Sequence, residues 1–325
     1  MNEHIAARYR RFAEIEAHGR SPLYEACALG VADDADALAF LAALPDEKRQ
    51  PNLLFAALRH VCGTPRDWSA FRASLLECAD AVRAVMLARR TQTNEAGRCA
   101  TLLPVLARLP QPLALLEVGA SAGLCLLPDR YGYDYGGHCL PLAWPGAPVF
   151  PCRASAATPL PAVHPRIVWR CGLDLHPVDI ADASQRAWLE TLVWPEQTDR
   201  LQRLRAAMAV AQRDPPRLER GDLLRDLASC ARDAPADATL VVFHSAVLAY
   251  VTDADLREAF AQTVRELGAV WVSNETPGVF PAIRQRLVRK GPRGAFLLAV
   301  DGAPVAWTDA HGGWIEWIAQ TEGSV

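Results

Sequence analysis

Lysine is nearly absent from this sequence. Only Lys48 and Lys290 occur, so arginine carries almost all of the positive charge, and the formal net charge is −3. Proteins that bind nucleic acid usually carry a basic surface, so the composition argues against generic nucleic-acid binding. Apolar runs that approach the roughly 20 residues needed to span a bilayer are also lacking. Residues 1–8 contain no apolar core, so we expect neither a signal peptide nor a membrane association.

Paired cysteine spacings are missing as well. The nine cysteines are odd in number and never form a Cys-x-x-Cys pair, which fits neither a disulfide framework nor a zinc site. We therefore expect small buried thiols in a reducing cytoplasm and no bound metal. The cysteines stand at positions 27, 62, 78, 99, 125, 139, 152, 171 and 230.

Two regions of different character follow one another. In residues 1–110, apolar side chains recur at three- and four-residue spacing, which predicts an all-helical region. In residues 111–325, short apolar runs alternate with helical segments, which predicts a Rossmann-like α/β domain with a mostly parallel sheet. Asp301-Gly302 is a strong turn signal for an antiparallel hairpin near the C-terminus. Residues 128–165 are rich in Pro, Gly and Tyr, and we expect an insertion that contains a small hairpin around residues 133–140.

The most informative stretch is residues 113–124, which read LALLEVGASAGL. An apolar run, a loop of small residues and a second apolar run predict a strand, a tight turn and the N-terminus of a helix. Gly119 and Gly123 allow the backbone to approach a ligand closely, and a helix N-terminus offers free N–H groups. The pattern therefore places a ligand site at the carboxyl end of this strand.

This stretch resembles the first motif of S-adenosylmethionine-dependent methyltransferases, in which an acid stands two residues before the first glycine. Glu117 holds the position of that acid, and Ser121 replaces a glycine that is usual there. The resemblance implies that Glu117, Gly119, Ala120, Ser121 and Gly123 contact S-adenosylmethionine.

The same residues also spell Gly-x-Ser-x-Gly, the nucleophile elbow of α/β-hydrolases. Ser121 would then be the nucleophile, with Asp301 or Asp309 and His311 completing a triad. The helical character of the preceding 112 residues, and the lack of an oxyanion loop before the motif, favour the methyltransferase interpretation. In a third interpretation the small residues serve packing alone.

Six stretches across the chain are distinctive: QTNEAGR at 92–98, LLEVGASAGL at 115–124, DRYGYDYG at 129–136, VWPEQ at 193–197, VFHSAVLAY at 242–250 and DAHG at 309–312. They resemble the uncharacterised, largely bacterial family labelled domain of unknown function 2332. The resemblance implies a Rossmann-like methyltransferase fold behind an N-terminal helical region, and no established activity.

Acidic residues at later strand ends acquire roles under the methyltransferase interpretation. A carboxylate at the end of the second strand usually accepts hydrogen bonds from the ribose hydroxyls, and we assign this position to Asp174. Asp134 is the rival, but it lies too soon after Gly123 for a helix, a loop and a strand. Asp222 either meets the adenine amino group or caps a helix.

His244 and Ser245 end the predicted fourth strand, where such enzymes often face the transferred methyl group. Methyl transfer mainly requires alignment of the reactants, and a base is needed only if the acceptor loses a proton. His244 titrates near neutral pH and suits that task, while a satisfied core histidine is the alternative. Glu275 is a second candidate base, with a structural role as its alternative.

Contacts to the acceptor are predicted for a further set of polar and aromatic residues. Each has a structural alternative, which is a helix cap for Asn94, a first-turn acid for Glu196 and aromatic packing for the tyrosines. The predicted acceptor-binding residues are Asn94, Arg98, Tyr133, Tyr135 and Glu196.

The sequence thus predicts an S-adenosylmethionine-dependent methyltransferase that acts on a small-molecule acceptor. A hydrolase with Ser121 as its nucleophile and a non-catalytic ligand-binding protein are the alternatives. The acceptor and the oligomeric state stay open.

Overall fold

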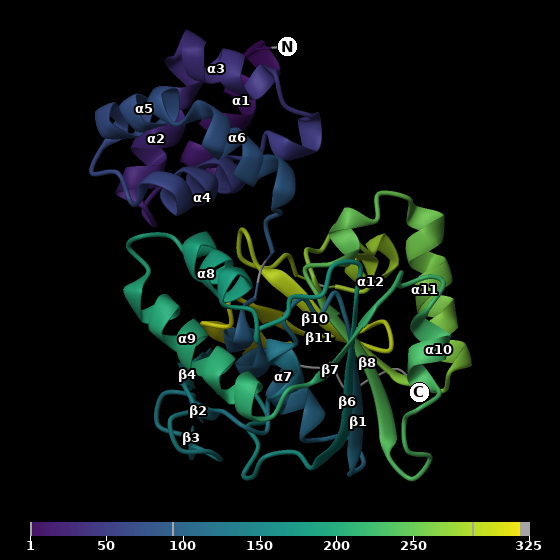
Figure 1. Ribbon diagram of the computed structural model, residues 1–325. Helices are drawn as coiled ribbons and strands as arrows, with labels where there is room; N and C mark the ends of the chain where they lie inside the picture. The colour runs from purple at the N-terminus through teal and green to yellow at the C-terminus, as the bar shows by residue number, and fades with distance from the viewer. Residues whose placement is uncertain (1, 93, 288, 319–325) are drawn as a thin grey trace. The chain divides into compact units, whose positions relative to one another are not determined.

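The computed structural model describes residues 2–92, 94–287 and 289–318, and the chain forms two compact units (Figure 1). The helical unit comprises Met1–Thr93 and Asp182–Gln202, and the sheet unit comprises Asn94–Ala181 and Arg203–Val325. The division therefore lies at residues 93/94 rather than near residue 110, and a later segment joins the N-terminal helices.

The helical unit is built around aromatic side chains. Phe55 is fully buried, and the rings of Tyr9 and Phe71 pack edge-on against it with centroid distances of 6.1 and 5.5 Å. Side chains of Ser21, Asp34 and Asp67 cap the helices that follow them, as these residue types commonly do. The helices are α1 (Asn2–Phe12), α2 (Pro22–Asp33), α3 (Ala35–Ala42), α4 (Pro51–Cys62), α5 (Trp68–Glu77), α6 (Ala79–Ala88) and α8 (Ala183–Leu192).

Long-range contacts explain why residues 182–202 belong to the helical unit. Trp188 is 3% exposed within the helical core, and its indole nitrogen donates to the carbonyl of Arg90. The Arg59 guanidinium donates to the carbonyls of Thr191 and Val193. Sequence periodicity does not reveal such contacts, because they join positions more than 90 residues apart.

The sheet unit contains a nine-stranded sheet in the order β5-β12-β11-β10-β9-β8-β1-β6-β7. Five neighbouring strands run parallel, and they follow the chain order 3-2-1-4-5 from β7 to β9, so the chain winds outward from β1 in both directions. These strands are β1 (Leu113–Val118), β6 (Ile167–Asp174), β7 (Arg217–Arg220), β8 (Thr239–Ser245) and β9 (Val270–Glu275).

The C-terminal part of the sheet is antiparallel, as the sequence predicts. Strands β10 (Phe296–Val300), β11 (Ala303–Thr308) and β12 (Trp314–Trp317) pair antiparallel in succession. Asp301 and Gly302 form the turn between β10 and β11 with φ values of 50° and 74°, and positive values at both positions are typical of a two-residue hairpin.

The two faces of the sheet are covered by different helices. Helices α10 (Leu227–Ala231), α11 (Ala254–Glu266) and α12 (Pro281–Gln285) pack on one face, over apolar side chains such as Leu116, Val242 and Trp271. Helix α7 (Cys99–Leu106) lies on the other side of β1 (Figure 1). Helix α9 (Thr198–Arg213) leads from the helical unit into the sheet unit.

The prediction of a helix directly after the loop that follows β1 is wrong. Only a 3₁₀ helix over Leu124–Leu126 follows the loop, and the chain then enters β2 (Gly132–Asp134). The rest of the connection to β6 contains β3 (Cys139–Leu140), β4 (Val149–Pro151) and β5 (Arg153–Ala154). Strands β2 and β3 pair antiparallel, which confirms the small hairpin in the predicted insertion.

Candidate functional site

The candidate site lies at the carboxyl ends of β1, β6 and β8. From β1 the chain proceeds to β6 and β7 on one side, and it then returns to β8 and β9 on the other side. The topological switch point therefore falls between β1 and β8. In open α/β sheets, ligands bind outside the carboxyl ends of the strands at this point.

The loop after β1 has left-handed backbone at every second residue. Gly119, Ser121 and Gly123 have φ values of 72°, 50° and 67°. Glycine adopts this conformation freely, whereas a residue with a side chain does so at a cost. Ser121 thus has a backbone conformation that suits glycine, which is the residue usual at this position of the motif. Strained non-glycine residues of this kind gather at functional sites.

The N–H groups of this loop are all engaged within the protein. Gly119 and Ala120 donate to the carbonyl of Leu173, and Gly123 donates to the carbonyl of Ala120. The N–H groups of residues 121 and 122 donate to side chains. Because no α-helix begins here, the expected cradle of free N–H groups at a helix N-terminus is not formed.

Asn94 and Asp174 hold the loop in place. The Asn94 amide donates to the Ser121 hydroxyl at 2.9 Å and accepts from the Ala122 N–H at 2.9 Å. Asp174 accepts from the N–H groups of Ser121 and His176 at 2.8 and 2.7 Å. Asn94 is therefore neither a helix cap nor an exposed polar contact, since both ends of its amide brace the loop. Asp174 stands at the end of the strand beside β1, where the sequence places it.

Glu117 and Arg98 are two buried ionisable groups at this site, an acid and a base with exposed fractions of 6% each. Burial raises the pKa of Glu117 well above its usual value, with Cys125 and Asp174 adding to the rise and Arg98 opposing it. Among the described residues, the Oε2 atom of Glu117 has no hydrogen-bond partner. Arg98 donates to the carbonyls of Ala310 and Ser245 at 2.8 and 3.0 Å.

No ion pair joins Arg98 to a carboxylate anywhere in the described parts of the chain. Buried charges are ordinarily paired. A buried guanidinium bonded only to backbone carbonyls, together with a buried carboxyl that has one unbonded oxygen, is therefore an unusual combination.

His244 and Glu275 face the opposite side of the sheet. Glu117 pairs with Phe243 in the parallel register and Val118 pairs with His244, so His244 and Glu117 project to different faces. His244 is fully buried; its Nε2 accepts from the Trp271 indole at 3.0 Å and its Nδ1 donates to Glu275 at 2.8 Å. Neither ring nitrogen is left for an acceptor, so His244 is placed as a satisfied core histidine rather than as a base.

Glu275 is also committed to the fold. Its Oε1 atom accepts from His244 and from the N–H groups of Val247 and Leu248 at 2.8 and 3.0 Å. The side chain is 2% exposed. This position fits the structural alternative, because the carboxylate fixes the turn that follows β8.

Val247 covers the glycine that begins the loop. A Cβ atom at Gly119 would lie 2.3 Å from Cγ2 of Val247, so close packing alone requires glycine there. Ala246, just before it, has a φ value of 58°. Sequence reasoning missed both residues, although they follow directly after the predicted His244-Ser245 pair.

The proposed hydrolase triad is not assembled. Within the described ranges, no histidine nitrogen bonds the Ser121 hydroxyl, which instead accepts from Asn94. His311 faces Glu95 at 3.4 Å. Asp309 accepts from N–H groups of its own turn, and Asp301 accepts from the N–H of Trp271.

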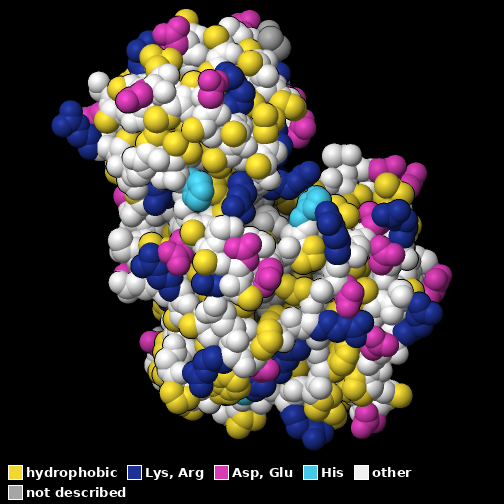
Figure 2. Space-filling view, in the orientation of Figure 1, with side chains coloured by type: hydrophobic (Ala, Val, Ile, Leu, Met, Phe, Trp, Pro, Cys, Tyr) yellow, Lys and Arg dark blue, Asp and Glu magenta, His cyan; other side chains and the backbone are white. Residues whose placement is uncertain are grey.

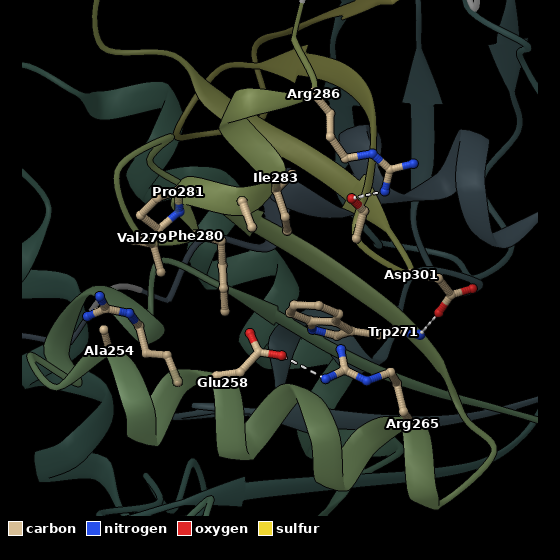
Figure 3. A pocket seen from close by; sticks show the side chains of 13 residues that line it. Ala254, Glu258, Arg265, Trp271, Val279, Phe280, Pro281, Ile283, Arg286 and Asp301 are labelled. Atoms are coloured by element: carbon tan, nitrogen blue, oxygen red, sulfur yellow. Dashed lines mark hydrogen bonds and ion pairs between the residues drawn. The ribbon is translucent and has the colours of Figure 1, made fainter. Parts of the chain in front are cut away.

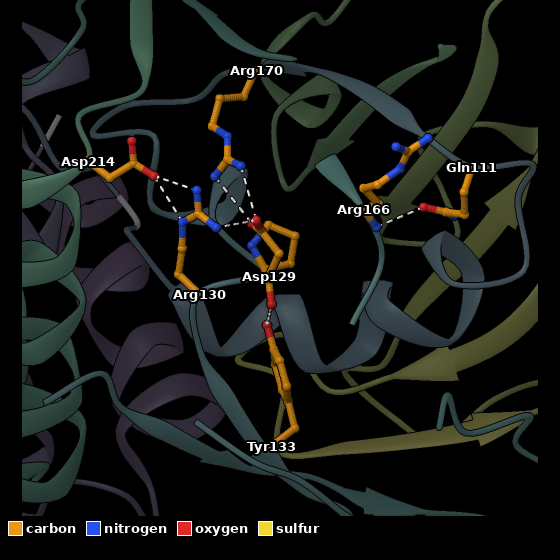
Figure 4. A network of polar contacts seen from close by, with 8 residues as sticks. Gln111, Asp129, Arg130, Tyr133, Arg166, Arg170 and Asp214 are labelled. Atoms are coloured by element: carbon orange, nitrogen blue, oxygen red, sulfur yellow. Dashed lines mark hydrogen bonds and ion pairs between the residues drawn. The ribbon is translucent and has the colours of Figure 1, made fainter. Parts of the chain in front are cut away.

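The tyrosines of the insertion are structural. Tyr133 and Tyr135 are 0% and 4% exposed, and their hydroxyls donate to the carbonyls of Pro128 and Ala100 at 2.7 Å. Nearby, Asp129 binds the guanidinium groups of Arg130 and Arg170 (Figure 4). The Asp129–Arg170 contact anchors the insertion to β6, and both tyrosine hydroxyls are bonded within the fold, which fits the packing alternative.

Three other predicted acids lie outside the cluster. Glu196 belongs to the helical unit, where it accepts from the Ser21 hydroxyl and the Leu23 N–H at 2.8 and 3.2 Å. Asp222 accepts from the Leu224 N–H within its own turn, and Asp226 precedes α10. Asp134 lies on β2 in the small sheet, which favours Asp174 as the acid at the end of the second parallel strand.

The surface gives no indication of a single-sign binding face in the view of Figure 2, where acidic and basic side chains are interspersed. Among the described residues, no group of three or more His, Cys, Asp or Glu side chains is placed to hold a metal ion. The described helices include none that is long and apolar enough to cross a membrane.

Comparisons with known proteins identify the family and nothing more specific. A family model described as "Uncharacterized protein conserved in bacteria (DUF2332)" matches residues 6–317. No curated protein and no solved structure matches the chain. The chain therefore belongs to this uncharacterised family, as the sequence motifs indicated.

Proposed function

We propose that this member of the family is an S-adenosylmethionine-dependent methyltransferase that acts on a small-molecule acceptor. The observation that carries the proposal is the pair of buried groups Glu117 and Arg98 at the carboxyl edge of β1 and β8. The Rossmann-like order of the parallel strands supports it.

The chemistry of the pair fits the amino acid end of such a cofactor. Glu117 has an unbonded carboxyl oxygen, which suits an ammonium group, and the Arg98 guanidinium suits a carboxylate because it has several donors in a fixed plane. S-adenosylmethionine supplies an electrophilic methyl group when it is bound. Asp174, which lies close enough to Glu117 to affect its pKa, would accept from ribose hydroxyls, since each carboxylate oxygen can accept more than one hydrogen bond.

In methyl transfer, the residues of this chain would mainly align the cofactor with the acceptor. Methyl transfer is an in-line displacement, and positioning of the reactants supplies much of the rate. Asn94 and Asp174 fix the loop at residues 119–123 from two sides. His244 and Glu275 have no part in this proposal, because both ring nitrogens of His244 and the Oε1 atom of Glu275 are bonded within the protein. The Oε2 atom of Glu275, which also lacks a partner among the described residues, lies with them on the other face of the sheet.

Calorimetry tests the proposal directly. S-adenosylhomocysteine and S-adenosylmethionine should bind to the full chain. Glu117→Gln and Arg98→Lys should each weaken binding by about tenfold or more, because the first removes a carboxylate and the second replaces the planar guanidinium with an ammonium group that lacks its paired donors. Glu316→Gln is the matched control, since Glu316 is exposed on β12. The failure of both ligands to bind at millimolar concentration would refute the proposal.

A second readout concerns protons. The raised pKa of Glu117 favours its neutral form, so the binding of an ammonium group should release a proton. Titrations in buffers of different ionisation enthalpy measure that release, and it should disappear in Glu117→Gln. Binding without proton release would contradict the placement of the ammonium group at Glu117.

Labelling of Ser121 by a fluorophosphonate would instead support a hydrolase.

A further inference from the structure

A second site lies on the opposite face of the sheet, between α11 and α12. A pocket of about 480 Å³ opens there, and pockets of a few hundred cubic ångströms suit small molecules. Its floor is apolar: Trp271 and Ile283 are 4% and 7% exposed, and Phe280 packs edge-on against Trp271 at 5.1 Å (Figure 3).

Trp271 presents carbon rather than nitrogen to this pocket. Its indole N–H donates into the core, to Nε2 of His244 at 3.0 Å. Its backbone is fixed as well, because Asp301 both accepts from the Trp271 N–H and donates to the Trp271 carbonyl at 2.8 Å. The floor is thus a rigid aromatic surface without a free polar atom on the indole.

The rim of the pocket is cationic. Three arginines and two acids line it, which leaves one positive charge in excess. Arg265 is paired with Glu258 at 2.7 Å, whereas Arg257 and Arg286 donate to backbone carbonyls. In the described parts of the chain these two guanidinium groups have no carboxylate partner within ion-pair distance.

We propose that this pocket binds a small organic anion with a flat apolar body. The body would lie on Trp271 and Phe280, since aromatic surfaces stack favourably. The acidic group would be bound by Arg286, whose planar donors match carboxylate and phosphate groups. This site is separate from the Glu117 and Arg98 cluster, which faces the other side of the sheet.

Calorimetry with naphthalene-1-carboxylate tests the proposal on the full chain. The carboxylate should bind saturably, and the neutral naphthalene-1-carboxamide should bind about tenfold more weakly or worse, because it lacks the charge. Arg286→Met should weaken binding of the carboxylate by a similar factor. Arg284→Met is the matched control, because Arg284 is exposed on the same helix but does not line the pocket.

Two variants fill the pocket from opposite walls. Ala282 and Ala254 are exposed alanines that line the pocket from α12 and α11. Ala282→Trp and Ala254→Trp should each abolish binding of the carboxylate. Both variants should unfold at a temperature close to that of the unchanged protein. Saturating S-adenosylhomocysteine should not displace the carboxylate. The proposal is overturned if the carboxylate fails to saturate at millimolar concentration, if both filled variants bind normally, or if Arg284→Met loses as much affinity as Arg286→Met.

Discussion

Replacement of Gly119 by alanine should destabilise the sheet unit through two separable effects. The φ value of 72° is left-handed, which costs a residue with a Cβ atom about 1–2 kcal/mol. The new Cβ would also lie 2.3 Å from Cγ2 of Val247, and such overpacking costs about 1–3 kcal/mol. The expected total is about 2–5 kcal/mol.

Two further variants separate the effects. Gly268 has a φ value of 63° and open space around its Cβ position, so Gly268→Ala should lose only about 1–2 kcal/mol from backbone strain. Val247→Ala removes the two methyl groups that the new Cβ would meet. In the double variant Gly119→Ala/Val247→Ala, most of the overpacking should be relieved, since only the Cβ of residue 247 remains, 3.1 Å from the new Cβ. The coupling energy should recover about 1–3 kcal/mol.

Hydrogen exchange of peptides that cover β1 and β8 is the appropriate assay, because it reports opening of the sheet unit independently of the helical unit. If Gly119→Ala costs no more than Gly268→Ala, or if Val247→Ala leaves the deficit unchanged, then contact with Val247 is not the reason for glycine at this position.

Three other substitutions have expected outcomes. Burial raises the pKa of Glu117 above 4.5, its value in the unfolded chain, so the stability that this carboxyl contributes at low pH is lost as the pH rises through its folded pKa. In urea unfolding, Glu117→Gln should therefore be more stable than the unchanged protein by an amount that grows from pH 5 to pH 8. A stability difference that stays constant with pH would contradict this. Glu196→Ala should lower the stability of the helical unit by about 1 kcal/mol through its lost bonds to the first turn of α2, measured by hydrogen exchange of α2, with no change in S-adenosylhomocysteine binding. Tyr133→Phe should cost about 1–3 kcal/mol in urea unfolding, because the buried carbonyl of Pro128 loses its donor; weaker ligand binding in this variant would contradict a purely structural role.

Local sequence patterns predicted the strands of the sheet unit well. The apolar run that begins at residue 113 became β1, and His244 and Ser245 end β8 as predicted, because buried parallel strands need apolar side chains on both faces. The turn at Asp301-Gly302 was equally clear, since few residue pairs tolerate positive φ values twice in succession.

Long-range contacts limited the rest of the prediction. The helix expected after Gly123 ends after one 3₁₀ turn, where the chain enters an insertion anchored by the buried hydroxyls of Tyr131 and Tyr133. The tyrosines were visible in the sequence, but their partners were not.

Several of the predicted site residues lie together at the end of β1, although their contacts could not be read from residue type. Asn94, Ser121 and Asp174 come together as predicted neighbours, yet they bond one another or the loop backbone. His244 was indistinguishable from a catalytic histidine until Trp271 and Glu275 were seen to occupy both of its nitrogens.

The alternation of left-handed residues from 119 to 123 has a consequence for motif searches. A loop with left-handed backbone at every second position favours glycine or another small residue at those positions. It spells Gly-x-Ser-x-Gly when the middle position is serine and the outer two are glycine. The pattern then follows from the backbone conformation of the loop, and it does not by itself identify a nucleophile. A search for new hydrolases by this pattern should therefore also require a histidine within reach of the serine. Among the described residues of this chain, the Ser121 hydroxyl is bonded by Asn94 and by no histidine.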